Sequence, residues 1–352
     1  MTVITAWSAV SAYGVGAAAL ADGLREQRTV ASTVDPEAWP VPGGKACVVP
    51  GFDARELLGA KGTRSMDRVS ALAVLTAGQV ARDAGDLGED AGLVLGVNNG
   101  SAQSMLELTR DSLVKARPEF VKPAQFPNTL MNAAAAQCAI WHRLRGPNAT
   151  VAAGRTSGLV ALNHARRMQR SGRAEAVLCG AAEEFSTTRA WLEHHAAPNR
   201  PDGVLLGEGC AMLLVEPAAR HGRTELAELL GLAFGVFRAP AEAGPALAGC
   251  VRRVIAAAGE SPDRVWAHAA AHDPDLSDVD KPVDAVLGAP LRLPMTELVG
   301  DTHAASAAFG LAAVLALAVD EPRAGGRTAL VTAADRDGTV GCALLRLADA
   351  AA

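Results

Sequence analysis

The chain has 352 residues, of which 49% are hydrophobic, 20% charged and 4% aromatic, and its formal net charge is −5. This length is expected to form roughly two domain-sized units. The composition fits a compact soluble core. The negative charge and the lack of a basic stripe argue against a nucleic-acid partner.

Strand-like and helix-like segments alternate through the first part of the chain. Apolar, β-branched runs predict buried strands over 3–10, 93–97, 148–153 and 176–180. Apolar residues at helical spacing predict helices over 17–28, 69–84, 101–116, 130–144 and 158–169. Residues 31–59 are proline-rich and predict a loop, and the glycine-kinked run 203–215 predicts a hairpin.

The same alternation returns in the second part of the chain. The expected elements are a strand over 226–235, a helix over 246–258, a short strand over 265–267 that ends at His268, a turn and buried helix over 300–318, and strands over 328–333 and 341–347. Strand–helix alternation twice over predicts two α/β halves with mainly parallel sheets. We place the division near residue 217, giving halves of 1–217 and 218–352.

The turn over 151–158 is the centre of this pattern. A β-rich run enters it and a helical run leaves it, so residue 155 lies at a helix N-terminus. Unpaired N–H groups and the helix dipole favour an anion there, and a cation is disfavoured by about 0.3–1 kcal/mol at an exposed site. This chain has Arg155 at that place. A helix N-terminus of this kind suits a nucleophilic thiolate, but arginine occupies the position, so the nucleophile is missing.

Several motifs occur in an order that is itself informative. They are Phe126-Pro127-Asn128-Thr129, Leu144-Arg145-Gly146-Pro147, Gly154-Arg155-Thr156-Ser157-Gly158, Leu206-Gly207-Glu208-Gly209, Ala267-His268 and a turn over 300–310 that contains His303. In order and approximate spacing this set resembles the β-ketoacyl synthases. The resemblance implies an α/β protein with the thiolase fold: two pseudo-symmetric halves in a five-layer α-β-α-β-α sandwich, assembled as a dimer.

The chain departs from that family where the chemistry is done. By resemblance, the nucleophilic cysteine falls on Arg155, the two histidines on His268 and His303, and a lysine on Leu298, while the gating-loop pattern is lost near 334–338. The family's reaction needs a thiolate to hold the acyl chain and two histidine donors to stabilise an enolate oxygen. Arginine forms no thioester and stays protonated. Arg155, His268 and His303 are therefore predicted to be vestigial positions, and no catalytic residue is predicted.

A ketosynthase-like chain without its cysteine resembles the chain-length factor, the β subunit of type II polyketide ketosynthases. The resemblance implies a heterodimer with an active, cysteine-bearing ketosynthase, an acyl carrier protein that reaches the complex, and no cofactor. Chain-length factors of aromatic pathways often carry glutamine at the lost cysteine and are longer than this chain. A reduced-chain or polyene-type system therefore stays open.

The helix predicted over 101–116 offers candidates for a chain tunnel. Ala102, Met105 and Thr109 lie on one face at i, i+3 and i+7. By resemblance these positions face the tunnel in chain-length factors, where bulky aromatic side chains tend to end it. Two small residues and one flexible residue predict a longer or wider cavity. The alternative is an ordinary core stripe.

By resemblance, the strand over 148–153 pairs with its counterpart across the dimer two-fold. Its small and apolar residues suit a strand buried on both faces. The loop around 126–131 reaches, by the same analogy, toward the partner's cavity. The predicted interface residues are Ala149, Thr150, Val151, Ala152, Phe126 and Met131. The alternative is an interior strand with no partner.

Other interpretations of the central residues stay open. Arg155 is either a plug paired with an internal carboxylate or the product of drift. For His268 and His303 a structural role is favoured over a relic catalytic one. A competing function is an enzyme in its own right: a malonyl-carrier decarboxylase using the two histidines, or an acyltransferase using Ser157. A third is a homodimeric binding protein with no ketosynthase partner.

The remaining patterns predict neither a metal site nor a membrane span. His194, His195 and His272, with Asp273 and Asp275, form no HExxH motif and no tight cluster. The six cysteines are scattered, without a CxxC, so we expect buried thiols in a reducing cytoplasm. No basic and apolar leader and no apolar run of 18 residues is recognised. The predicted location is cytoplasmic.

Overall fold

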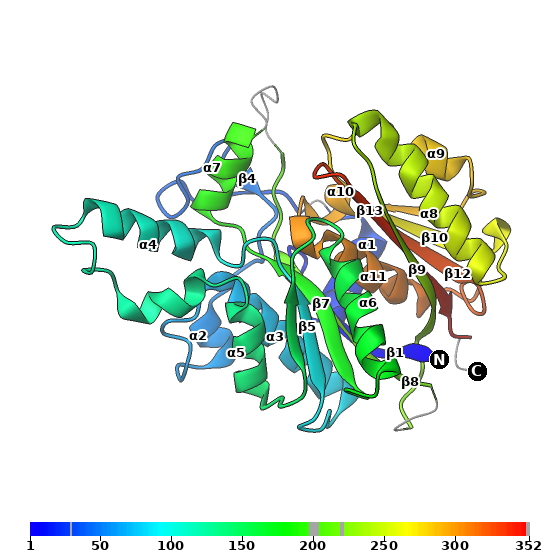
Figure 1. The fold of residues 1–352 in the computed structure, drawn as a ribbon, viewed down its shortest axis with the longest axis horizontal. Helices are drawn as coiled ribbons and strands as arrows, with labels where there is room; N and C mark the ends of the chain where they lie inside the picture. Colours follow the sequence, from blue (N-terminus) through cyan, green and yellow to red (C-terminus); the bar gives the residue numbers. More distant parts are fainter. Residues whose placement is uncertain (29, 197–203, 219–221, 350–352) are drawn as a thin grey trace.

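The computed structural model describes residues 1–28, 30–196, 204–218 and 222–349 (Figure 1). Its strands are β1 (Thr2–Ser11), β2 (Gly14–Val15), β3 (Ser32–Thr33), β4 (Lys45–Ala46), β5 (Gly92–Gly96), β6 (Asn148–Val151), β7 (Val177–Glu183), β8 (Gly209–Pro217), β9 (Ala227–Val236), β10 (Val265–His272), β11 (Leu291–Pro294), β12 (Thr328–Asp335) and β13 (Thr339–Leu347). An 11-stranded sheet runs in the order β11-β10-β12-β13-β9-β1-β8-β7-β5-β6, with β2 beside β1, and β3 pairs with β4 separately.

Helices connect these strands. They are α1 (Ala17–Glu26), α2 (Ala54–Leu58), α3 (Arg68–Ala84), α4 (Ala102–Val114), α5 (Ala133–His142), α6 (Ser157–Arg170), α7 (Thr187–Ala196), α8 (Ala243–Ala257), α9 (Asp280–Asp284), α10 (Met295–Val299) and α11 (Ser306–Ala318). Short 3₁₀ segments include η1 (Pro123–Thr129) and η4 (His303–Ala305). Asp67 and Ser101 begin α3 and α4 by accepting N–H groups of the first turn, as N-cap residues do.

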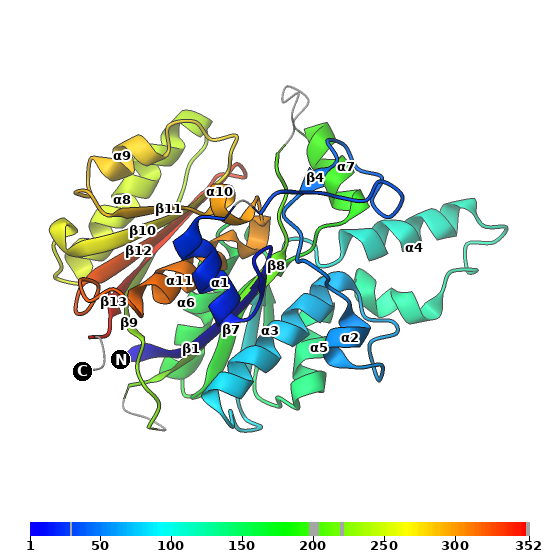
Figure 2. The same cartoon turned by 180° about the vertical axis from the view of Figure 1, so that it is seen from behind.

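The layers follow from which helix faces are apolar. α3 and α5 pack on the part of the sheet formed by β1, β5, β7 and β8, and α8 packs on β9, β12 and β13 (Figures 1 and 2). α6 and α11 lie between the two parts of the sheet. Every residue of α11 from Ser306 to Ala316 is buried, as expected for a helix that is apolar on all sides. The five-layer α-β-α-β-α sandwich is confirmed.

The close approach of the two central helices depends on one glycine. A Cβ added at Gly158 of α6 would lie 2.6 Å from the backbone nitrogen of Ala308 in α11. Contacts under 3.0 Å force neighbours to shift, so a larger residue would separate the helices. This packing positions the start of α6, and with it the turn that carries Arg155.

Some expectations about the elements are wrong. The sheet is mixed rather than mainly parallel, because β1, β8, β9 and β13 pair antiparallel at its centre. β10 continues past His268 to His272, since a run of alanines contains no stop signal. The described part of the expected hairpin forms one strand, β8, while Leu206 bridges to Asp301. The expected loop over 31–59 contains α2, which Asp53 caps.

The two predicted halves share one sheet. β8 ends at Pro217 and β9 begins at Ala227, so the expected division at residue 217 falls in the connection between them. β1 pairs with both β8 and β9. The division itself stays a prediction. All six cysteines are buried and free, as expected. In the described ranges we find no helix with the length and hydropathy of a membrane span.

Candidate functional site

The turn between β6 and α6 is held by its own hydroxyl groups. Thr156 Oγ1 donates to the Ala153 carbonyl (2.6 Å), and Ser157 Oγ donates to the Gly154 carbonyl (2.7 Å) and accepts from the Ala153 N–H (2.9 Å). These hydroxyls stabilise the turn before the helix rather than capping its N–H groups. Ser157 is completely buried and both its hydrogen bonds are internal to the turn.

Arg155 is buried, with 1% of its surface exposed, and its guanidinium contacts three carboxylates. Nη2 lies 2.5 Å from Asp301 Oδ2, and Nη1 lies 2.6 Å from Asp273 Oδ2 and 3.4 Å from Asp335 Oδ2. The Arg155 backbone N–H also donates to Asp335 Oδ2 (2.8 Å). Nε finds no acceptor within the described chain. The attraction between the guanidinium and these carboxylates outweighs the repulsion between a cation and the helix N-terminus.

The pKa values follow this charge arrangement. Burial lowers the pKa of Arg155, but Asp301, Asp273 and Asp335 more than offset that effect and raise it. Burial raises the pKa of Asp301, yet the charges of Arg155 and Arg189 bring it down to about 2. Burial dominates at Asp273, whose pKa is raised despite Arg155. At the centre of the site, one buried cation, Arg155, is thus held by three buried carboxylates.

His303 lies next to this group, in a tight turn. Its φ of +41° is unusual for a residue with a side chain, and its N–H donates to Asp301 Oδ1 (3.0 Å). Its Nδ1 is 4.0 Å from Glu183 Oε2. Burial and the charge of Arg155 lower the pKa of His303 to about 4, and burial raises that of Glu183 to about 7. The imidazole is therefore neutral at physiological pH.

His268 belongs to a different contact group. Its Nε2 lies 2.7 Å from Thr332 Oγ1 and its Nδ1 contacts Arg292. Burial, helped by His272 and Arg292, lowers the pKa of His268 to about 3. His303 donates its N–H to Asp301, which pairs with Arg155, whereas in the described ranges His268 contacts none of the three aspartates around Arg155. The assignment of both histidines as vestigial positions stays a prediction.

Sequence reasoning missed the residues that complete the site. Arg189 of α7 is buried and donates to the carbonyls of Glu184 (3.0 Å), Gly207 (2.7 Å) and Asp301 (2.7 Å). Arg336 contacts Glu193 (2.9 Å), Asp275 (3.1 Å) and Asp273 (3.8 Å). Asp301 and Asp335 gave one signal, because each is a charged residue that closes an apolar stretch, whereas Asp273 follows His272.

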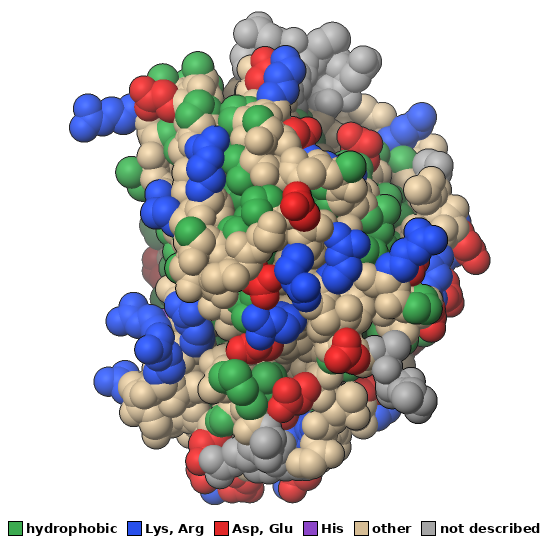
Figure 3. All heavy atoms as spheres, turned by 90° about the vertical axis from the view of Figure 1, so that its right-hand side faces the viewer, with side chains coloured by type: hydrophobic (Ala, Val, Ile, Leu, Met, Phe, Trp, Pro, Cys, Tyr) green, Lys and Arg blue, Asp and Glu red, His purple; other side chains and the backbone are tan. Residues whose placement is uncertain are grey.

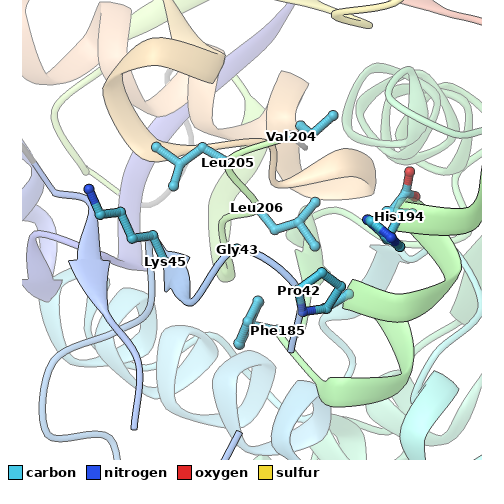
Figure 4. A pocket seen from close by; sticks show the side chains of 10 residues that line it. Pro42, Gly43, Lys45, Phe185, His194, Val204, Leu205 and Leu206 are labelled. Atoms are coloured by element: carbon cyan, nitrogen blue, oxygen red, sulfur yellow. The ribbon is translucent and has the colours of Figure 1, made fainter. Parts of the chain in front are cut away.

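A cavity of about 570 Å³ is lined by both apolar and polar side chains, among them Leu206, whose backbone bridges to Asp301. Lys45 and His194 stand on opposite sides of it, with Leu206, Pro42 and Phe185 between them (Figure 4). Glu193 also lines it and joins it, through Arg336, to Asp273. We find no group of three or more His, Cys, Asp or Glu side chains that could hold a metal among the residues placed by the structure.

The predicted tunnel residues lie on a helix at the margin of the molecule. α4 extends away from the main body in both ribbon views (Figures 1 and 2). Ala102 is 6% exposed, whereas Met105 is 38% exposed and Thr109 is also exposed. The three do not form a buried core stripe in this chain. Their role as tunnel residues stays a prediction.

The predicted interface residues share one side of the molecule. β6 is the last strand of the sheet, so one of its edges has no neighbour among the described strands. Ala149, Thr150 and Val151 are half-buried, and Ala152 is exposed. Apolar side chains around this edge and α4 are exposed: Leu106, Leu113, Val114, Phe120, Phe126, Leu130, Met131 and Ile140. The face on the α8 and α9 side shows basic, acidic and hydrophobic side chains interspersed (Figure 3).

Comparison with known proteins agrees with this architecture. The solved structure described as the ishigamide ketosynthase/chain length factor is 42% identical, covers 99% of each chain and superposes with a TM-score of 0.93. A β-ketoacyl synthase from Burkholderia phymatum, 18% identical, shares the fold over 98% of this chain with a TM-score of 0.84.

Curated relatives match a shorter stretch. The 3-oxoacyl-[acyl-carrier-protein] synthase 2 of Vibrio cholerae is 30% identical over 210 residues, which is 53% of this chain and 51% of that protein. The chain thus spans about half the length of the first curated relatives that it matches. Residues 2–221 match the family described as β-ketoacyl synthase, N-terminal domain. With this match over more than half of its length, the chain belongs to the β-ketoacyl synthase family.

Proposed function

We propose that this chain is the non-catalytic, chain-length-determining subunit of a type II polyketide ketosynthase. The observation that carries the proposal is Arg155: at the position assigned to the nucleophilic cysteine, a buried cation is paired with three carboxylates. A guanidinium so held offers no nucleophile for an acyl chain. The 42% identity to a structure described as a ketosynthase/chain length factor supports the same role.

The proposed partner is an active ketosynthase whose cysteine carries the growing chain. The free edge of β6 and the exposed apolar residues beside α4 supply a surface for it. We expect an obligate, largely apolar interface that buries more than about 2,000 Å² in total. A 20% identical structure is described as a type II polyketide acyl carrier protein in complex with its ketosynthase, and we extend the carrier protein to this system by that analogy.

The experiment that tests this role is co-expression with an active ketosynthase, followed by mass determination of the purified complex. We expect a one-to-one heterodimer, and we expect this chain to be largely aggregated when it is produced alone, with a soluble fraction that suffices for assays. Phe126→Asp, at a side chain 56% exposed, should abolish the complex, because it places a charge in an apolar interface. Val236→Asp, at an 81% exposed residue on β9, is the matched control and should leave it intact.

A stable homodimer that ignores the ketosynthase would overturn the subunit role. The two enzymatic alternatives are tested on the same preparations. We expect no carbon dioxide release from malonyl-carrier protein by this chain alone and no acylation of Ser157 by an acyl-thioester analogue. Release that His303→Ala abolishes would instead establish a decarboxylase.

Within the heterodimer, Ala102, Met105 and Thr109 are proposed to line the end of the chain tunnel. Met105 and Thr109 are exposed in the isolated chain, so a partner has room to enclose a cavity against them. Ala102→Phe should shorten the products of the complex, because a ring would occupy the proposed tunnel end. Product length by mass spectrometry checks this, and unchanged products would remove Ala102 from the tunnel.

A further inference from the structure

Three aspartates around Arg155 share one local geometry. In each, Oδ1 accepts the backbone N–H of the residue two positions later: Asp273 from Asp275 (2.8 Å), Asp301 from His303 (3.0 Å) and Asp335 from Asp337 (3.0 Å). In each, Oδ2 faces Arg155. An aspartate that binds its own turn in this way is oriented locally, whatever its other oxygen meets.

The carboxylates are therefore held in place without help from the guanidinium. Each of the three is only 1% exposed, so water cannot take over their solvation. They come from three separate connections: the end of β10, the segment before η4, and the end of β12. Arg155 comes from the turn before α6, more than 100 residues earlier in the chain.

The backbone beside Arg155 is shaped to let one carboxylate approach. Gly154 has a φ of +52°, and a Cβ there would lie 2.3 Å from Asp335 Oδ2. The missing side chain allows Asp335 to accept the Arg155 N–H as well as to face its Nη1. Arg189 adds a further support, since it binds the backbone carbonyl of Asp301 and thereby fixes that turn.

We propose that Asp273, Asp301 and Asp335 form a preorganised binding site for a guanidinium cation, and that Arg155 is its built-in ligand. The ligand class follows from geometry, because a planar group with several N–H donors meets oxygens on two sides at 2.5 and 2.6 Å. The bound arginine connects the first part of the chain with three turns of the second. The proposal does not depend on the polyketide role, because the same contacts exist whatever the chain assembles with.

Removal of the arginine side chain should leave a site that a free guanidinium ion can fill. We would prepare the full-length Arg155→Ala chain, in its heterodimer where the chain needs one, and measure Tm with and without N-methylguanidinium at millimolar concentrations. Without the ion, Tm should fall on the order of 10 °C, because three buried carboxylates lose the one cation that pairs with all of them. N-methylguanidinium should restore several degrees saturably, while methylammonium and sodium chloride at equal ionic strength should not.

Two further variants separate binding at this site from a general effect. Arg346→Ala removes an arginine that contacts Glu228 (2.7 Å) and Glu260 (2.8 Å) at the surface, with 41% of its side chain exposed, and should show a small Tm change and no rescue. Arg155→Ala combined with Asp301→Asn should melt higher than Arg155→Ala alone, because one uncompensated charge is gone. It should also lose most of the rescue.

Equal effects of N-methylguanidinium and methylammonium on Arg155→Ala would overturn the proposal, as would a variant as stable as the natural chain. If Arg155→Ala does not fold, Arg155→Lys takes its place. Lysine keeps the charge but presents one ammonium instead of a planar fork, so its Tm should fall measurably. A lysine variant with the natural Tm would show that any cation suffices, and would equally overturn the assignment.

Discussion

Arg155 shows how local and tertiary electrostatics can oppose each other at one residue. A helix N-terminus disfavours a cation by a fraction of a kcal/mol, whereas three buried carboxylates at 2.5–3.4 Å favour it far more strongly. The tertiary contacts decide the outcome. They also imply that replacing only the arginine is more harmful than replacing the whole cluster by neutral groups.

The acid limb of the stability profile should depend on Asp301. Its pKa in the folded chain is about 2, below the ordinary value near 3.9, so its ionised form stabilises the fold. This contribution is present above about pH 4 and is lost as the pH falls toward 2, on the order of 2 kcal/mol in total.

The measurement is urea unfolding of the natural chain and of Asp301→Asn at pH 6, 4 and 3. The free energy of unfolding should fall more steeply on acidification for the natural chain than for Asp301→Asn, so the difference in this free energy between the two chains should narrow. Two parallel profiles would show that the ionisation of Asp301 makes no contribution to the acid limb.

At this scale the sequence permits only part of the site to be predicted. The position of Arg155 at a buried turn follows from the strand and helix around it, and pairing with an internal carboxylate was one of two expectations. The partners lie 118, 146 and 180 residues away, so no spacing rule connects them. His268 was placed at a strand end that the alanine-rich run does not mark.

Among the elements, the first turns of α3 and α4 share a buried acid. Glu184 accepts from the Val69 N–H (3.3 Å) at the start of α3, and from Ser101 Oγ (3.0 Å) and the Gln103 N–H (3.4 Å) at the start of α4. Burial and the nearby Asp67 raise the pKa of Glu184 to about 8, although these hydrogen bonds favour its ionised form. Through these hydrogen bonds, Glu184 attaches the first turn of the peripheral helix α4 to the core.

Glu184→Gln should therefore gain stability relative to the natural chain as the solution becomes alkaline. The raised pKa means that the protonated acid suits the fold, and that its contribution is lost as the pH rises through about 8. The variant should gain several degrees of Tm relative to the natural chain between pH 6 and pH 9. Glu119→Gln, at a side chain 66% exposed, is the control. A pH-independent difference would contradict this interpretation.

The packing of α6 on α11 gives a second test at this scale. Gly158→Ala should destabilise the chain by about 1–3 kcal/mol, because the added methyl group meets the backbone of Ala308. Gly249→Ala lies inside α8, with its nearest neighbour 3.7 Å away, and should be neutral or stabilising by about 0.5–1 kcal/mol. Urea midpoints of the two variants compare a crowded helical glycine with an open one.

Element prediction succeeded where periodicity was long and failed where it was short. α3, α6, α8 and α11 match the expected helices within a few residues, because α3, α6 and α8 each bury a regular apolar face and α11 is a long run of buried apolar residues. α2 has only five residues and none of them is buried, so its sequence carries no apolar periodicity. The expected hairpin rested on glycines, but Gly209 instead has a φ of +142° and approaches the Val10 carbonyl as β8 begins.

For the whole molecule, an ordered set of motifs identified the fold where no single motif did. The turn at Gly154, the segment at Leu206 and the turn at His303 are far apart in the chain and meet in space, as the bridge between Leu206 and Asp301 illustrates. The five layers were expected from the resemblance to the β-ketoacyl synthases, whereas the alternation of strands and helices predicted only two α/β halves. It could not predict strand direction, because antiparallel pairing at the centre joins elements that are distant in sequence.

The free edge of β6 has a consequence for the relative amounts of this chain and of its proposed partner. A strand with free backbone groups on one side accepts any strand of matching register, a second copy of the same chain included. If the proposed heterodimer forms through this edge, self-association and binding to the ketosynthase compete for the same backbone groups, and mass action decides between them. Under that proposal, chain made in excess of its partner would self-associate through β6 (Asn148–Val151), and matched synthesis of the two proposed subunits would prevent this.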